Sequence, residues 1–138
     1  MKVYLSNKKC IDHSFKHCSN LASLENIALD SEITNLVIDE FLSSFSFSEV
    51  QEAVKIILKK CRINCEVVIM ELDCNILFRH YTRDEIQIDY FNKLFFEGVK
   101  KCILNTEIVE SCVPNNFSVQ EKSISPQGLS TVKIRRMK

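Results

Sequence analysis

One stretch of the sequence constrains the fold more than any other, because two apolar runs flank a helix-forming segment. Residues 35–38 form a mostly apolar run with β-branched residues that ends in Asp39-Glu40, which is typical of a buried strand. Residues 48–60 start at a capping serine, carry acidic side chains in the first turn and lysines in the last, and repeat apolar residues at helical spacing. Residues 66–70, which are apolar after Glu66, form the second run. This order predicts a right-handed strand-helix-strand unit and a parallel sheet.

The flanking segments extend this unit into one α/β domain over residues 1–138. Residues 2–5 alternate and predict a short first strand, while residues 26–29 suggest a turn or short strand. The other predicted elements are helices over 75–80, 85–96 and 106–113 and an antiparallel hairpin formed by 117–122 and 131–135. We therefore expect about five strands, mostly parallel, with an abbreviated N-terminal half.

Composition excludes several functions. The 18 Lys+Arg balance the 18 Asp+Glu, so no global field attracts nucleic acid, and only Lys133, Arg135, Arg136 and Lys138 form a small basic patch. Two glycines are too few for a Walker A or GxGxxG loop. No apolar run reaches the roughly 18 residues of a membrane span, and the apolar stretch in residues 1–5 is too short and too soon polar for a signal peptide, so we expect a cytoplasmic protein with no membrane partner.

The seven cysteines are odd in number and scattered, which favours reduced thiols over a disulfide scaffold. Cys10, His13, His17 and Cys18 could supply zinc ligands, but their spacing matches no common zinc motif and favours a polar loop, so we expect no metal. Cys74 follows Asp73 at a predicted helix start, where the helix dipole lowers a thiol pKa, and is expected to be the most reactive cysteine.

The order of segments from residue 35 onward resembles class I S-adenosylmethionine-dependent methyltransferases, particularly the short versions frequent in phage genomes. The matching segments are Leu36-Val37-Ile38-Asp39, Phe41-Leu42, the helix from Glu49, Arg62-Ile63-Asn64-Cys65, Glu66-Val67-Val68-Ile69, Asp73 and the C-terminal hairpin. The resemblance covers about 100 residues and implies a Rossmann-like methyltransferase-type sheet. The glycine-rich cofactor loop of the family is replaced by Leu5-Ser6-Asn7-Lys8-Lys9.

The resemblance implies S-adenosylmethionine as the cofactor. Ser6 and Asn7 hold positions of the cofactor loop, while Asp39 and Glu40 follow the carboxyl end of a parallel strand, where open α/β sheets bind ligands. Asp73 matches a family position. Asp39, Glu40 and Asp73 could instead be helix caps or, for the first two, a solvated turn. No catalytic residue is singled out, because methyl transfer depends mainly on positioning the donor against the acceptor.

Two functions remain open at this stage. The first is S-adenosylmethionine-dependent methyl transfer to an unknown acceptor. The second is a non-catalytic binding or assembly module of the same fold, for example in a phage-encoded complex, with a homo-oligomer or protein partner covering an apolar patch where a missing layer should pack. A nucleic-acid accessory role of the basic C-terminal strand is a third, less favoured reading.

Overall fold

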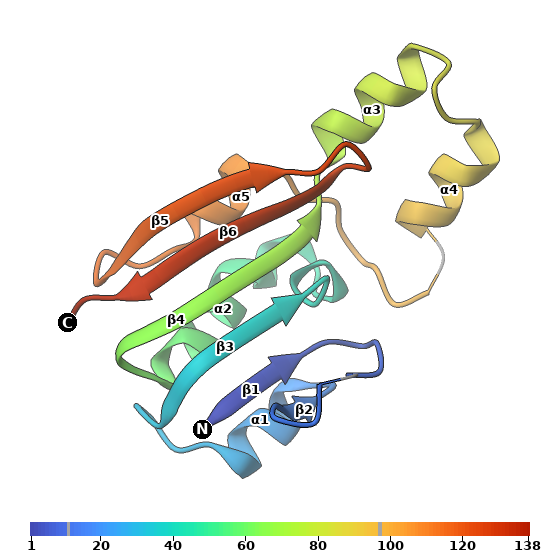
Figure 1. Cartoon of the computed structure of the whole chain (residues 1–138). Helices are drawn as coiled ribbons and strands as arrows, with labels where there is room; N and C mark the ends of the chain where they lie inside the picture. Colours follow the sequence, from blue (N-terminus) through green and yellow to red (C-terminus); the bar gives the residue numbers. More distant parts are fainter. Residues whose placement is uncertain (11, 97) are drawn as a thin grey trace.

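The computed structural model describes residues 1–10, 12–96 and 98–138. A six-stranded sheet forms its centre, in the order β2-β1-β3-β4-β6-β5 (Figure 1). The strands are β1 Lys2–Leu5, β2 Lys16–Cys18, β3 Ile33–Asp39, β4 Cys61–Leu72, β5 Phe117–Ile124 and β6 Leu129–Arg136. The helices are α1 Leu21–Ile27, α2 Val50–Lys59, α3 Cys74–Thr82, α4 Ile88–Phe96 and α5 Thr106–Ser111, with short 3-10 turns at Leu42–Ser44 and Phe47–Glu49.

The predicted strand-helix-strand unit is present as β3-α2-β4, and the two strands pair in parallel. The C-terminal hairpin is also confirmed, because β6 runs antiparallel to both β4 and β5. Between Val119 and Glu121 the β5–β6 register shifts, so Gln120 is an extra residue on β5. The architecture is thus the mixed, mostly parallel α/β sheet that the sequence predicted.

Two expectations for the N-terminal third are wrong. The sheet has six strands because the polar segment Lys16–Cys18 pairs in parallel with β1. The turn or short strand expected at residues 26–29 is absent, because residues 26 and 27 are the end of helix α1, Leu21–Ile27. The Asn20 side chain caps this helix by accepting a hydrogen bond from the Ser23 amide. Both corrections concern short elements whose formation depends on neighbours in space.

Among the described residues, the core of the sheet lies on one face. Alternate strand residues such as Val3, Leu36 and Val67 are buried and belong to one cluster with Ile57 of α2 and Val109 of α5. Their neighbours along the strands, such as Val37 and Val68, are only half-buried. Figure 1 shows α2 and α5 behind the sheet, and no described helix lies in front of it. We call this second surface the open face.

Connection handedness explains the open face. The right-handed β3-α2-β4 crossover places α2 on one face of the sheet. The connection from β1 to β2 moves across the sheet in the opposite direction, so a right-handed connection there passes over the opposite face. That link is short, and its described residues form no helix. Lys2 Nζ on the open face lies 5.8 Å from the ring of Phe15 in this link. A loop therefore stands where a doubly wound sheet has a helix.

Helices α3 and α4 extend beyond the end of β4 (Figure 1) and have a small core of their own around Leu77 and Phe91. The β5–β6 turn packs against it at Gly128, whose φ is +90° and whose added Cβ would lie 2.9 Å from Leu77 Cγ. An L-residue there meets both an unfavourable backbone conformation and a clash.

Gly128→Ala is therefore expected to lower the free energy of unfolding by about 1–3 kcal/mol in chemical denaturation. Gly98→Ala is the matched control, because Gly98 has a φ of +83° but no atom within 4 Å of an added Cβ. The control should lose only the backbone contribution, about 1 kcal/mol. Equal losses in the two variants would contradict the role of the Leu77 contact.

Candidate functional site

The carboxyl ends of β1 and β3 meet at one edge of the sheet, because the two strands are parallel neighbours. Ser6 and Asn7 follow β1, while Asp39 ends β3 and Glu40 follows it. All four line one pocket of about 190 Å³, together with Lys8, Gly98, Val99 and Lys100. Four of the five predicted site residues are thus brought together where α/β sheets bind ligands.

Backbone hydrogen bonds fix the turns that carry these residues. Ser6 is fully buried, its amide donates to the Cys18 carbonyl, and its hydroxyl accepts from the Lys8 amide at 3.0 Å. Glu40 has a φ of +48°, and its amide donates to the Met70 carbonyl. The left-handed backbone at Glu40 is strained for a residue with a side chain. It turns the chain sharply out of β3 while the carboxylate stays at the pocket.

Ion pairs within the chain already engage the two carboxylates of this pocket. The Lys8 ammonium is paired with Glu40 and lies 3.8 Å from Asp39 Oδ1. Lys100 Nζ lies 3.7 Å from Glu40 Oε1, and the Tyr4 hydroxyl donates to Asp39. Burial and the neighbouring Asp39 carboxylate raise the pKa of Tyr4 to about 12, so Tyr4 stays a neutral donor.

A buried carboxyl binds the turn that follows β3. Glu71 is 2% exposed and accepts from the amides of Leu42 and Ser43 at 2.8 and 3.2 Å. Burial raises the pKa of Glu71 to about 7. Burial also lowers the pKa of Lys100, an effect that the Glu71 charge opposes. Glu71 therefore holds the turn after β3, and its charge state is coupled to a pocket lysine.

Sequence reasoning missed Tyr4, Lys8, Lys100 and Glu71. A signal existed for Glu71, since it continues the alternation of Cys65, Val67 and Ile69 on the core face of β4. For Lys100, no spacing or motif in the sequence relates it to Glu40. Its ion pair joins residues far apart in the chain, which a local pattern does not encode.

Asp73, the fifth predicted site residue, lies elsewhere. It is 2% exposed, caps α3 by accepting from the Ile76 amide, and does not line the pocket. Its other oxygen accepts from the amide and the hydroxyl of Thr106 at 2.9 and 3.0 Å. Of the two readings considered for Asp73, the structure supports the helix cap.

The expectation that the helix start lowers the pKa of Cys74, on which its predicted reactivity depended, is wrong. Burial and the Asp73 charge raise the pKa of Cys74, and these effects outweigh the amide hydrogen bonds at the helix start. All seven cysteines are free thiols. Within residues 1–10, 12–96 and 98–138, no group of three His, Cys, Asp or Glu side chains is arranged to hold a metal ion. Over the same residues, no helix has the length and apolarity to cross a membrane.

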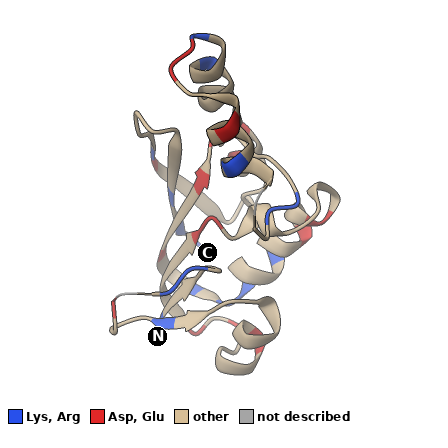
Figure 2. Ribbon diagram, turned by 90° about the vertical axis from the view of Figure 1, so that its right-hand side faces the viewer, with Lys and Arg blue, Asp and Glu red and all other residues tan. Residues whose placement is uncertain are grey.

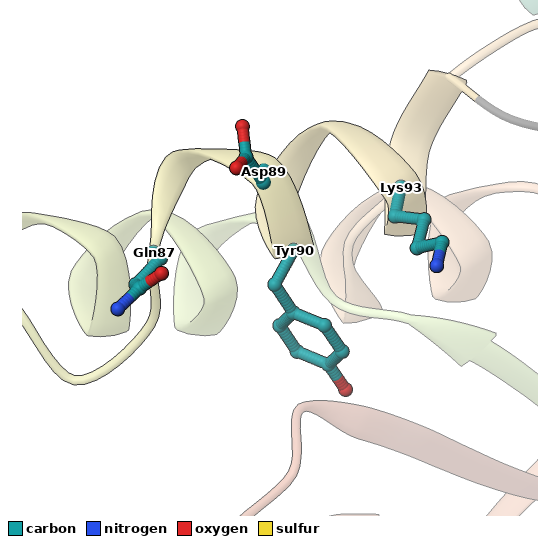
Figure 3. Close-up of a pocket in the computed structure, with 4 residues that line it drawn as sticks. All are labelled: Gln87, Asp89, Tyr90 and Lys93. Atoms are coloured by element: carbon teal, nitrogen blue, oxygen red, sulfur yellow. The ribbon is translucent and has the colours of Figure 1, made fainter.

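A second pocket, of about 550 Å³, lies along α4 and is lined by Gln87, Asp89, Tyr90 and Lys93 (Figure 3). Its four side chains come from one short segment, so it is an open groove rather than a site built between elements. Figure 2 shows that acidic and basic residues alternate over the ribbon without gathering into one large patch of a single sign. The edge formed by β1 and β3 remains the better candidate site.

The strand order, the parallel strands and the antiparallel strand inserted before the last one define a Rossmann-like fold of the methyltransferase type. Three solved structures illustrate the likeness. A SAM-dependent methyltransferase from Methanosarcina mazei gives a TM-score of 0.56 at 14% identity, covering 89% of this chain and 66% of that one. One from Archaeoglobus fulgidus gives 0.55 at 10% identity, with coverages of 91% and 70%.

The third is magnesium protoporphyrin IX methyltransferase from Synechocystis PCC 6803 with bound SAH, which gives a TM-score of 0.58 at 10% identity. The alignment covers 88% of this chain and 50% of that enzyme. The chain thus spans between half and seven tenths of the length of these three structures. No protein-family model and no curated protein matches the sequence. The comparisons therefore establish the fold.

The residues at the candidate site do not fit S-adenosylmethionine well. The pocket of about 190 Å³ is smaller than the roughly 300–1,000 Å³ of sites that enclose small molecules. Ser6, Asn7 and Lys8 carry Cβ atoms where close approach of backbone to a ligand calls for glycine. Asp39 and Glu40 are already paired with Lys8. A ligand amine or hydroxyl would have to displace that ammonium.

Proposed function

We propose that this chain is a methyltransferase-like protein that acts by binding another macromolecule rather than by transferring a methyl group. One observation carries the proposal: Lys8 bridges Asp39 and Glu40 across the edge where a ligand would enter. A cofactor would have to break this pairing and enlarge the pocket, and both steps reduce its affinity.

A second candidate is S-adenosylmethionine-dependent methyl transfer to an acceptor that the geometry does not identify. The convergence of Ser6, Asn7, Asp39 and Glu40 on one pocket favours it. Lys8 is largely exposed, with 59% of its side chain accessible, so it could move aside for a ligand. The two candidates differ in a single measurable property, the affinity for the cofactor.

Isothermal titration with S-adenosylmethionine and S-adenosylhomocysteine separates them. The binding-module proposal predicts no saturable heat up to millimolar ligand, and no ligand mass carried through purification, because the pocket is too small and its carboxylates are paired. Saturable binding that Asp39→Ala weakens at least about tenfold, a loss of about 1.4 kcal/mol, would overturn this proposal in favour of the enzyme.

Asp30→Ala is the matched control for that titration. Asp30 is another carboxylate paired with lysines, Lys59 and Lys60, and it does not line the pocket. A ligand that binds at the β1–β3 edge should be insensitive to its removal. Equal weakening by both substitutions would place the ligand elsewhere and would also contradict the assigned site.

A further inference from the structure

The open face has a defined composition because the strand register aligns its residues in rows. The first row contains Lys2, Asn35, Glu66, Arg135 and Ser118, and the second contains His17, Tyr4, Val37, Val68, Lys133 and Glu121. The third contains Asp39, Met70, Thr131 and Ser123, followed by the pair Leu72 and Leu129. These rows alternate with the residues of the core, so their side chains lie on the other face.

Apolar side chains form the middle of the open face. Tyr4, Val37, Val68 and Met70 are adjacent across three strands, and each is half-buried. Charged residues surround them as cross-strand ion pairs, Glu66 with Arg135 and Glu121 with Lys133, the latter at 3.2 Å. An apolar centre with a polar rim is the usual anatomy of a protein–protein interface.

An uncovered face is unusual for a sheet whose strands are mostly parallel. Parallel sheets have both faces covered in almost all known cases, since their strands are apolar on both sides. Four strands of this sheet, β2-β1-β3-β4, are parallel, yet the described helices cover only one of its faces. The open face thus retains apolar surface that a second layer would remove from water.

The charges of the open face indicate what that layer is. The rows contain three Lys or Arg side chains, Lys2, Lys133 and Arg135, and three carboxylates, Asp39, Glu66 and Glu121, together with His17. A balanced surface selects neither a nucleic acid nor a strongly charged peptide. It does suit a two-fold contact, in which the same surface meets itself and the ion pairs of one copy can lie beside those of the other with opposite charges adjacent.

The size and relief of the surface also suit this contact. Five strands about 4.8 Å apart, each contributing about six residues at about 3.3 Å, present about 500 Å² of sheet. Two copies would bury about 1,000 Å², the lower limit for a specific interface. A pocket of about 350 Å³ beside Val68, Gln120 and Lys133 gives room for side chains of a facing sheet. Stacked sheets interdigitate in this manner about 10 Å apart.

We propose that two copies of this chain associate face to face through the open face, with Tyr4, Val37, Val68 and Met70 at the centre of the contact. The inference rests on the proposed function, since it supplies the binding partner of a non-catalytic module. Its test uses no ligand. A monomer that binds no cofactor would refute the dimer alone, whereas a dimer that binds S-adenosylmethionine would refute the binding-module proposal alone.

Sedimentation velocity from micromolar to submillimolar protein tests the proposal. The wild-type chain should sediment as a concentration-dependent dimer, and Val68→Asp should weaken the dimer at least about 100-fold, because it would bury an unpaired charge. Leu29→Asp is the matched control: Leu29 is 70% exposed and lies outside the sheet, so this variant should dimerise like the wild type.

Circular dichroism first verifies that each variant is folded. Should Val68→Asp fail to fold, Thr131→Arg provides the same test, since Thr131 lies in the third row and a long cation there obstructs the contact without entering the core. A wild-type monomer at the highest concentration would overturn the proposal. So would a folded open-face variant that dimerises as tightly as Leu29→Asp.

Discussion

Replacing Asp73 by alanine is expected to lower the free energy of unfolding by about 3–5 kcal/mol. The buried carboxylate accepts three hydrogen bonds, from the Ile76 amide and from the amide and hydroxyl of Thr106. Its removal leaves the start of α3 uncapped and orphans buried donors beside α5. Because small domains are stable by only about 5–15 kcal/mol, this loss is large. Urea denaturation followed by circular dichroism measures it.

Asp89→Ala is the matched control for this experiment. Asp89 is an exposed acidic residue in the first turn of α4, so its removal should cost about 0.5 kcal/mol through the helix dipole alone. An Asp73→Ala variant as stable as this control would contradict the structural role of Asp73. It would return Asp73 to the set of candidate ligand-binding residues.

Stability should also fall as pH rises from about 4.5 to about 7, through the ionisation of Glu71. The pKa of Glu71 is raised from 4.5 to about 7 by burial, so in this window the folded state holds a proton that the unfolded state has lost. Folding therefore binds a proton, and the contribution present below pH 4.5 is lost as pH rises through the folded pKa. The expected decline is about 3 kcal/mol.

Thermal or urea unfolding at several pH values tests this expectation. Glu71→Gln keeps an oxygen for the amides of Leu42 and Ser43 but cannot ionise, so its profile should lose this decline between pH 4.5 and 7. Glu66→Gln, a mostly exposed carboxylate on the opposite face of β4, should keep the wild-type profile. A Glu71→Gln profile parallel to the wild type would show that Glu71 is not the group responsible.

Local sequence patterns predicted the strands and helices whose buried side chains repeat at the regular spacing of that element. The apolar runs at 35–38 and 66–70 lie within β3 and β4, and the predicted helix over 48–60 contains α2. Lys16–Cys18 was missed because this segment is polar, and only its pairing with β1 makes it a strand. For α1 the signal was present, since Leu21, Leu24 and Ile27 are spaced as one helical face after the capping Asn20.

The part of the candidate site that follows from the strand topology could be predicted from the sequence. Residues after parallel strands converge, so Asp39 and Glu40 could be located beside Ser6 and Asn7. Their charge partners could not, because the Lys8–Glu40 and Lys100–Glu40 pairs depend on how distant loops approach each other. Asp73 shows the converse, since one acidic residue before a helix is compatible with a ligand contact or a cap until its neighbours are known.

The two outer strands of the sheet are poor templates for adding further strands, which bears on aggregation. At one edge β2 has only three residues, and at the other β5 carries the extra residue Gln120 beside Glu121 and Lys122. Short edge strands, bulges and edge charges all hinder the strand-by-strand growth that leads to fibrils. The chain should therefore resist amyloid-like assembly at high concentration, even if its apolar surface makes it associate.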